Sequence, residues 1–182
     1  MCLFFCGCGA TEPPQPAKEA ADPDLIVWPR EEKAIRIEVN ADRDLNMYES
    51  KAHSLQICVY QLDNPGAFSD LAKTRDGINA LLKAEPFDKS VKNVSRLFIQ
   101  PFENNVFHLD RVENANFVGI VCGYFDSTPE NCAKVWEIPP RATTTGHLFW
   151  KETKYRAGTL DLDLHLTDRA MAERTGPEQE PQ

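Results

Sequence analysis

Histidines and carboxylates are the residues of this chain whose chemistry could support acid–base catalysis or metal binding. Asp161 and Asp163 alternate along one predicted strand, which would place their carboxyl groups about 6 to 7 Å apart on one face, a separation that paired carboxylates of hydrolases can use. An exposed acidic strand face is the ordinary explanation in a chain with a formal charge of -8. The histidines lack the short paired spacing of metal sites, and His108-Leu109-Asp110 is only a weak pair. They are His53, His108, His147 and His165.

Catalytic motifs are also missing from the sequence. It contains no Gly-x-Ser-x-Gly elbow, no glycine loop that could hold phosphates and no HExxH helix. An enzyme therefore has little support, and we expect no catalytic residue, no metal site and no cofactor.

The first ten residues contain a cysteine in a setting typical of lipid attachment. Met1 to Ala10 is apolar and uncharged, and Gly7 supplies the small residue that lipoprotein processing needs before the modified cysteine, Cys8. A complete secretory signal has a basic start and a longer apolar region, so we interpret Met1 as a truncated or misassigned start. The alternative is a buried amino-terminal strand that holds three cysteines. We favour lipidation of Cys8, because three acyl chains would make membrane attachment effectively permanent.

The residue after this cysteine indicates which membrane holds the anchor. Gly9 is not the aspartate that commonly retains lipoproteins in the inner membrane. We therefore expect the inner leaflet of the outer membrane, with the rest of the chain facing the periplasm.

Whether the other cysteines form a disulfide depends on the cellular compartment of the protein. In an oxidising periplasm Cys122 and Cys132 can pair across a hairpin whose turn lies near Ser127, and closing a loop of about ten residues would add around 3 kcal/mol. The alternative is that they stay unpaired. Cys58 lies in a predicted central strand and is expected to act as a small buried hydrophobe.

Length and composition predict one globular domain with a tail at each end. The chain has 182 residues, 42% of them hydrophobic, and its pI near 5.0 argues against binding nucleic acid, whose phosphates attract a basic face. We predict four parts. They are residues 1–8 as a truncated lipoprotein signal, residues 9–24 as a proline-rich tether, residues 25–167 as a β-sandwich domain and residues 168–182 as a polar tail.

Hydrophobic periodicity predicts a mainly β domain of seven to eight strands. Residues 35–40 and 160–166 alternate between apolar and polar side chains, which indicates strands with one wet face. Residues 55–62 and 117–125 are apolar on nearly both faces, which favours central strands. Weaker strands are expected at residues 94–100, 106–112, 134–138 and 148–155. Short strands separated by turn residues suggest a sandwich.

One segment has the period of a helix instead. It follows Asp63-Asn64-Pro65, which is typical of a cap followed by proline at the first helical position. Gly77 is expected to split the segment into two short helices, and Pro86 closes it. An apolar stripe of this kind is most often packed on a sheet. Its apolar residues are Phe68, Leu71, Ala72, Ile78, Leu81 and Leu82.

An ordered set of short motifs carries a resemblance that no single motif would. The set consists of Ile35-Arg-Ile-Glu-Val-Asn-Ala41, Asp44-Leu45-Asn46, Val59-Tyr60-Gln61-Leu62, Phe68-Ser-Asp-Leu71, Phe117-Val-Gly-Ile-Val121 and Trp136. In this order behind a lipidation motif, it resembles the TssJ (SciN, VasD) lipoproteins of the bacterial type VI secretion system. The resemblance implies a transthyretin-like β-sandwich with a short inserted helical element. It also implies an outer-membrane lipoprotein that holds the periplasmic carboxy-terminal region of TssM, in a complex completed by TssL.

The chain departs from the family pattern in two places. Family members often carry a Pro-Gly turn where this chain has Pro101-Phe102-Glu103-Asn104-Asn105, and the segment at residues 139–158 is long. Both departures alter loops without changing the class of fold.

The resemblance also implies which loop contacts the partner. In the family the loop joining the first two strands contacts TssM, and here that loop is residues 42–53. Met47 and Tyr48 offer the adaptable apolar and large rigid contacts that binding loops use. The alternative is that Leu45 and Met47 tuck under the sandwich while Asn46 makes a turn. The predicted partner-binding residues are Asp42, Arg43, Asp44, Leu45, Asn46, Met47, Tyr48 and Glu49, of which the charged ones would form a rim that tunes partner choice.

A periplasmic binder of small ligands, or a chaperone, is the second rival function. Sandwich scaffolds host many unrelated functions, and several aromatic residues could line a pocket, although a structural role for them is the simpler reading. These residues are Tyr124, Phe125, Trp136, Phe149 and Trp150.

Overall fold

The computed structural model describes residues 19–146 and 150–174, and strands predominate within them. Cys8, the predicted signal at residues 1–8 and most of the predicted tether lie outside these residues, as do His147 and Phe149. The strands are β1 Glu31–Ala41, β2 Leu55–Leu62, β3 Val91–Ile99, β4 Asn104–Arg111, β5 Phe117–Cys122, β6 Ala133–Glu137, β7 Arg141–Thr145, β8 Glu152–Arg156, β9 Leu160–Leu166 and β10 Met171–Glu173. The helices are a 3-10 turn at Pro23–Leu25, α1 Gly66–Leu71, α2 Arg75–Leu81 and α3 Pro129–Cys132.

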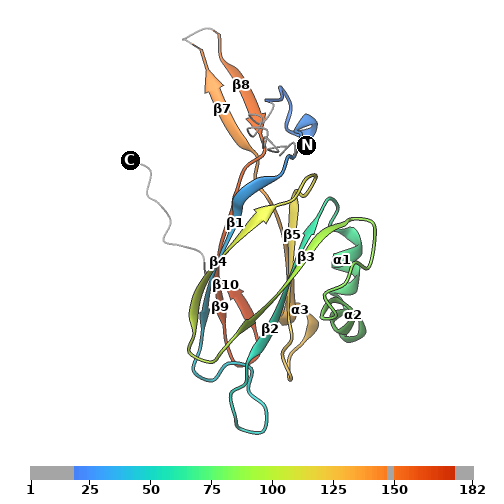
Figure 1. Cartoon of the computed structure of the whole chain (residues 1–182), viewed down its shortest axis with the longest axis vertical. Helices are drawn as coiled ribbons and strands as arrows, with labels where there is room; N and C mark the ends of the chain where they lie inside the picture. Colours follow the sequence, from blue (N-terminus) through green and yellow to red (C-terminus); the bar gives the residue numbers. More distant parts are fainter. Residues whose placement is uncertain (1–18, 147–149, 175–182) are drawn as a thin grey trace, which may run out of the picture.

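Eight of the strands form two four-stranded sheets that face each other (Figure 1). One sheet has the order β10-β9-β1-β4 and the other the order β3-β2-β5-β6. In the first sheet β1 pairs parallel with β9, so that Ile35 lies opposite Leu160. Cys122 Sγ on β5 lies 3.6 Å from Met171 Sδ on β10, a direct contact between the two sheets. The mainly β fold expected from the sequence is therefore confirmed.

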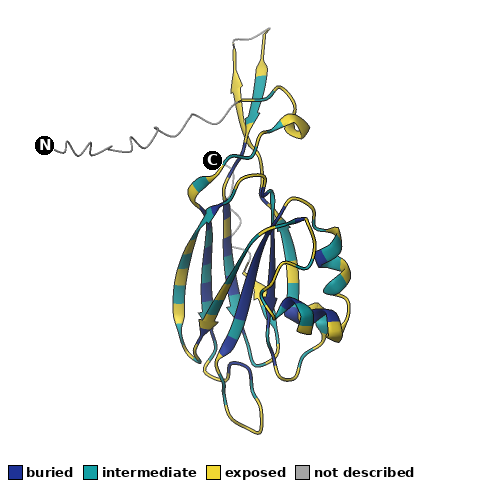
Figure 2. Cartoon of the chain, turned by 45° about the vertical axis from the view of Figure 1, so that its right-hand side comes forward, coloured by how far each residue is buried: buried dark blue, intermediate teal, exposed yellow. Residues whose placement is uncertain are grey.

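The core between the sheets is built by the period-two strands. On β1 the side chains of Ile35, Ile37 and Val39 are buried, while those between them reach the outer face. All four leucines of β9 are buried in the same manner. A strand directs alternate side chains to opposite faces, so this alternation of apolar and polar residues is what fixes which face is inside (Figure 2).

Two short helices cover the outer face of the second sheet (Figure 1), which explains why β2 is buried on both faces. Phe68 of α1 packs so closely over β5 that a Cβ at Gly119 would lie 2.7 Å from its ring. Tyr60 of β2 donates a hydrogen bond to the carbonyl of Leu81 at the end of α2. The central position expected for β2 and β5 thus depends on helices on one side and the core on the other.

A third, two-stranded sheet extends beyond the sandwich along the long axis (Figure 1). We call it the β7–β8 hairpin, of which the structure describes residues 141–146 and 150–156. The chain before β1 is attached to it, because Ala20 and Tyr155 exchange two backbone hydrogen bonds of 2.8 Å. The buried guanidinium of Arg111 holds the base of this region, donating to the carbonyls of Pro29 and Gly158 and pairing with Glu31 at 2.8 Å.

Several boundaries differ from the sequence predictions. Two strands were not expected, β7 and β10, and β10 lies within the predicted polar tail at residues 168–182. The strand predicted at 117–125 ends at Cys122. Pro65 is the residue before α1 and not its first residue, and the break between the helices precedes Gly77, because Thr74 accepts a hydrogen bond from the Gly77 amide at 3.0 Å and caps α2. Among the described residues no helix combines the length and apolar character needed to cross a bilayer.

Candidate partner-binding surface

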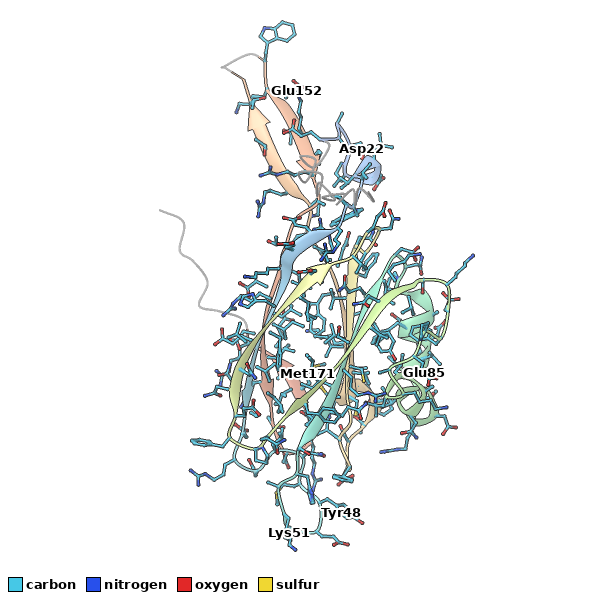
Figure 3. All side chains as sticks on the ribbon, viewed as in Figure 1. Asp22, Tyr48, Lys51, Glu85, Glu152 and Met171 are labelled. Carbon is cyan, nitrogen blue, oxygen red and sulfur yellow. The ribbon has the colours of Figure 1, made fainter. Side chains whose placement is uncertain are left out.

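The loop between β1 and β2, residues 42–54, lies at the end of the molecule opposite the β7–β8 hairpin. Figure 3 places Tyr48 and Lys51 at this end, and Asp22 and Glu152 at the other. We call the end that carries the β1–β2 loop the loop pole. The predicted partner-binding residues all belong to this loop and therefore lie together.

Leu45 and Asn46 form the buried base of the loop. Leu45 is fully buried and Asn46 is 1% exposed. The Asn46 side chain donates to the carbonyl of Ser54 at 3.0 Å and accepts a hydrogen bond from the Phe125 amide at 2.9 Å. Asn46 therefore joins the β1–β2 loop to the segment after β5. The alternative interpretation expected Leu45 and Met47 to tuck under the sandwich, and of these Leu45 is buried whereas Met47 is half-buried.

The tip of the loop is a tight turn. Tyr48 and Lys51 exchange two backbone hydrogen bonds of 2.9 Å, and the two residues between them, Glu49 and Ser50, have φ values of 47° and 61°. Residues other than glycine rarely adopt positive φ values, and holding the backbone there costs on the order of 1 to 3 kcal/mol for each residue. Asn46 also has a positive φ of 49°. The loop is thus a defined, strained structure that the rest of the fold maintains.

An aromatic cluster covers one side of the loop. The ring of Tyr48 stacks on that of Phe125 with 4.9 Å between centroids, and His53 meets Phe125 edge-on at 5.2 Å. Tyr48 is 49% exposed and Phe125 is 53% exposed. Sequence reasoning missed the contribution of Phe125 to this surface, because the loop and Phe125 are brought together only by tertiary contacts.

The turn between β3 and β4 adds a second aromatic contact at the loop pole. Phe102 is 70% exposed, and its amide donates to the carbonyl of Asp42 at 3.0 Å. The guanidinium of Arg43 lies over the Phe102 ring, 4.9 Å from the centroid. Exposed aromatic rings beside charged side chains are typical of the anchor residues of protein interfaces.

A hollow of about 260 Å³ lies beside this turn, lined in part by Asp42, Arg43, Phe102 and His165. His165 lies 2.7 Å from the carboxylate of Asp42. The lining contains no serine, threonine, cysteine or lysine that this pair could activate as a nucleophile. The hollow therefore offers a concave surface for contact beside the loop.

The other candidates for chemistry are engaged in structural contacts. Asp161 pairs with Arg36 at 2.7 Å and Asp163 accepts from Asn40 at 3.0 Å, so both carboxylates bridge β9 to β1. Within residues 19–146 and 150–174, no three His, Cys, Asp or Glu side chains gather as metal ligands would.

The aromatic residues proposed for a ligand pocket are dispersed. Tyr124 is buried, and its hydroxyl donates to the carbonyl of Ala170 at 2.7 Å. Trp136 donates to the carboxylate of Glu173 at 3.0 Å. Hydrogen bonds from Lys134 and Trp136 lower the pKa of the Glu173 carboxyl. Phe125 lies at the loop pole, and Trp150 belongs to the β7–β8 hairpin. The structure does not bring these residues together around one cavity.

Cys122 and Cys132 are buried free thiols, as is Cys58. Val121 pairs with Ala133 in the β5–β6 ladder. Cys122 directly follows Val121 and Cys132 directly precedes Ala133, so the two cysteines flank a paired position. Burial raises the pKa of both thiols, which disfavours their thiolate forms. The sulfur atoms are not bonded in the structure, and the disulfide stays a prediction.

Comparison with known proteins identifies a family to which the sequence is similar. Residues 33–168 match the family model T6SS-SciN, described as type VI secretion lipoprotein, VasD, EvfM, TssJ. This is a family of secretion lipoproteins and not a class of enzymes. Among curated proteins, no sequence matches the chain.

Solved structures share the fold at low sequence identity. The T6SS lipoprotein TssJ1 from Pseudomonas aeruginosa is 17% identical, with a TM-score of 0.56 over 82% of this chain and 99% of that chain. Serratia marcescens Lip, a membrane-bound component of the type VI secretion system, is 12% identical, with a TM-score of 0.57 over 82% and 99%. A chain of the structure titled "T6SS protein TssM C-terminal domain (869-1107) from EAEC" is 12% identical, with a TM-score of 0.57 over 78% and 98%.

Proposed function

The chain belongs to the T6SS-SciN (TssJ) family of type VI secretion lipoproteins, and from this premise we propose that it is an outer-membrane anchor that docks the periplasmic carboxy-terminal region of TssM. Acyl chains on Cys8 would hold one end in the inner leaflet, and TssL would complete the same complex. The protein would act by mechanical coupling, without turnover of a substrate.

The observation that carries this proposal is the position of the β1–β2 loop. The segment that leads from the proposed anchor joins the fold at the β7–β8 hairpin, and the loop lies at the opposite end (Figure 3). A partner that approaches from the inner membrane would meet the loop pole first. Because the loop is already ordered by buried contacts, binding would lose little conformational entropy.

We assign different roles to the residues of the loop. Tyr48, Phe125 and Phe102 would be the aromatic anchors, since they are exposed and held in place by stacking or by backbone hydrogen bonds. Asp42, Arg43, Asp44 and Glu49 would form a charged rim that guides approach. Leu45 and Asn46 would support the loop from beneath without touching the partner.

Capture of a purified periplasmic fragment of TssM by the immobilised chain tests this assignment. Tyr48→Ala combined with Phe125→Ala should weaken binding by roughly tenfold or more, because truncated aromatic anchors usually cost over 1 kcal/mol each. The matched control is Trp150→Ala, which removes an exposed aromatic ring at the other end of the molecule. Unchanged capture by the double variant, with an unchanged circular dichroism spectrum, would refute the loop pole as the docking surface.

The anchor has its own test. Mass spectrometry of the mature amino terminus from cells should show an acylated Cys8, and Cys8→Ser should release the protein from the membrane fraction. An unmodified cysteine in membrane-bound protein would contradict lipidation.

A periplasmic location also supports a disulfide between Cys122 and Cys132. Their thiols would be oxidised by a periplasmic dithiol oxidoreductase, whose own disulfide is reduced in exchange. After unfolding in an alkylating reagent, Cys58 should be labelled while Cys122 and Cys132 are labelled only after reduction. Labelling of all three before reduction would show that the pair stays reduced.

A further inference from the structure

The β7–β8 hairpin is basic, although the chain as a whole is acidic. Its sequence contains four basic residues and one acidic residue, whereas the whole chain carries a formal charge of -8. Register places Arg141 opposite Arg156 and Thr143 opposite Lys154, so three basic side chains lie on one face of the hairpin, together with the single acidic residue Glu152. Like charges that lie directly opposite destabilise a strand pair, and a bound anion would relieve this repulsion.

These charges are largely unpaired within the described residues. There, Arg141, Lys151 and Arg156 form no ion pair, and Lys154 pairs with Glu19 at 3.7 Å and with Glu152 at 3.9 Å. Every residue of β7 is exposed, and the core cluster contains no residue of β7 or β8 (Figure 2). The hairpin therefore presents its basic face to whatever surrounds that end of the molecule.

An exposed tryptophan lies at the end of this hairpin. Trp150 is 87% exposed, more than any other large hydrophobic side chain in the described chain. Gly146 shapes the backbone beside it, since its φ is 121° and a Cβ there would lie 1.8 Å from the Trp150 carbonyl oxygen. Tryptophan is enriched where an apolar phase meets water, because its ring is apolar and its N–H is polar.

The hairpin also lies on the anchored side of the molecule. Ala20, which is hydrogen-bonded to Tyr155, is the twelfth residue after Cys8. Extended at about 3 Å per residue, this segment would reach about 36 Å, whereas the strands of the hairpin extend only about 17 Å beyond Tyr155. Trp150 can therefore reach the membrane that holds the acyl chains.

We propose that the β7–β8 hairpin binds anionic phospholipid headgroups, with its basic face on the headgroups and Trp150 at their boundary with the acyl chains. This inference rests on the proposed lipid anchor and gives it a second contact with the same membrane. Each basic residue near an anionic surface strengthens attachment about fivefold, and the anchor makes the lipid local.

Sedimentation with phospholipid vesicles tests the proposal on the full-length Cys8→Ser chain. We expect binding to vesicles that contain phosphatidylglycerol, weaker binding to pure phosphatidylcholine, and loss of the difference at high salt. Arg141→Gln combined with Arg156→Gln should lower binding to anionic vesicles tenfold or more. This change removes a repulsion inside the hairpin, so its effect cannot come from unfolding of the hairpin. Lys73→Gln combined with Lys83→Gln is the matched control, with two exposed basic residues neutralised elsewhere.

Tryptophan fluorescence supplies an independent measurement. Brominated lipids should quench emission of the chain, and Trp150→Phe should remove most of that quenching while Trp28 and Trp136 remain. All variants share the apolar amino-terminal segment, so differences between them report on the hairpin.

The outcomes separate this inference from the proposed function. Equal binding by the arginine variant and its control would overturn the hairpin contact, even if Cys8 is acylated and TssM is captured. A hairpin variant that binds vesicles normally but loses TssM would assign the hairpin to a protein partner and would also overturn the proposal. Loss of lipidation in cells would refute the anchor without changing the vesicle results.

Discussion

Asn46 holds two loops of the loop pole together through one side chain. Its amide donates to the carbonyl of Ser54 and accepts from the amide of Phe125, and its own φ is positive. Alanine would remove two part-buried hydrogen bonds to the backbone and would strain the chain at this position, since asparagine tolerates a positive φ better. We expect Asn46→Ala to lower the free energy of unfolding by about 2 to 4 kcal/mol, measured by denaturant titration.

Asn79→Ala is the control for this prediction. Asn79 is exposed on α2, where replacement by alanine should change stability by about 0.5 kcal/mol or less. A loss for Asn46→Ala no larger than that of the control would show that the two hydrogen bonds do not support the loop.

Tyr60 makes stability depend on pH in the alkaline range. Burial raises the pKa of its phenol to about 12, whereas in the unfolded chain it titrates near 10. The folded state therefore keeps the proton more tightly, and this contribution is complete below about pH 10 and is lost as the pH rises toward 12. Thermal unfolding from pH 9 to 12 should show a steeper decline for the wild type than for Tyr60→Phe. Parallel curves for the two proteins would contradict the assignment.

The resemblance predicted which loop contacts the partner, but it did not predict which residues of that loop are buried. The resemblance placed the contact in residues 42–49, and the structure buries Leu45 and Asn46 within it while exposing Tyr48. Phe125 follows Asn46 by 79 residues and meets it only in the folded chain. No local pattern distinguishes a loop aromatic that completes a surface from one that packs inside, because the difference lies in which distant segment it meets.

At the scale of elements, Gly119 allows α1 to approach the sheet. A Cβ on this residue of β5 would lie 2.7 Å from the ring of Phe68. We expect Gly119→Ala to destabilise the protein by about 1 to 3 kcal/mol, because the ring or the strand must move. Adding Phe68→Leu should give a smaller total loss than the sum of the two single changes in a double-mutant cycle.

Gly66→Ala is the comparison for Gly119. Its Cβ would meet only the side chain of Asn64, at 3.0 Å, so that the most this change can remove is the 2.8 Å hydrogen bond from the Gly66 amide to that side chain. Additive losses for Gly119→Ala and Phe68→Leu would show that the two residues are not coupled.

Periodicity predicted the elements that the core defines. β1, β2 and β9 were recovered because each has one or two buried faces, which select apolar residues at fixed spacing. β7 could not be found in this way, since Arg-Ala-Thr-Thr-Thr is exposed throughout and has no apolar face. β10 is three residues long, too short to show a period. The split between α1 and α2 was expected, but the cap at Thr74 sets its position.

At the scale of the whole molecule, the sandwich and the β7–β8 hairpin should differ in local stability. The core cluster draws residues from β1, β2, β5 and β9 and none from β7 or β8. Hydrogen exchange should therefore occur by global unfolding for the central strands and by local opening for the hairpin. We expect amides of Thr143 and Thr153 to exchange at least about a hundredfold faster than those of Val59 and Ile120 by mass spectrometry. Equal protection would show that the hairpin unfolds together with the sandwich.

The parallel pairing of β1 with β9 brings together segments 125 residues apart, as in the contact between Arg36 and Asp161. Any chain that emerges from a channel amino-terminus first must therefore wait, with one edge of β1 open, until nearly all of it is out. Such distant pairing is slow to form, because the entropy of closing a long loop is lost before the stabilising contacts between the strands are made. The topology thus makes the first sheet the part of the fold that waits for the end of the chain.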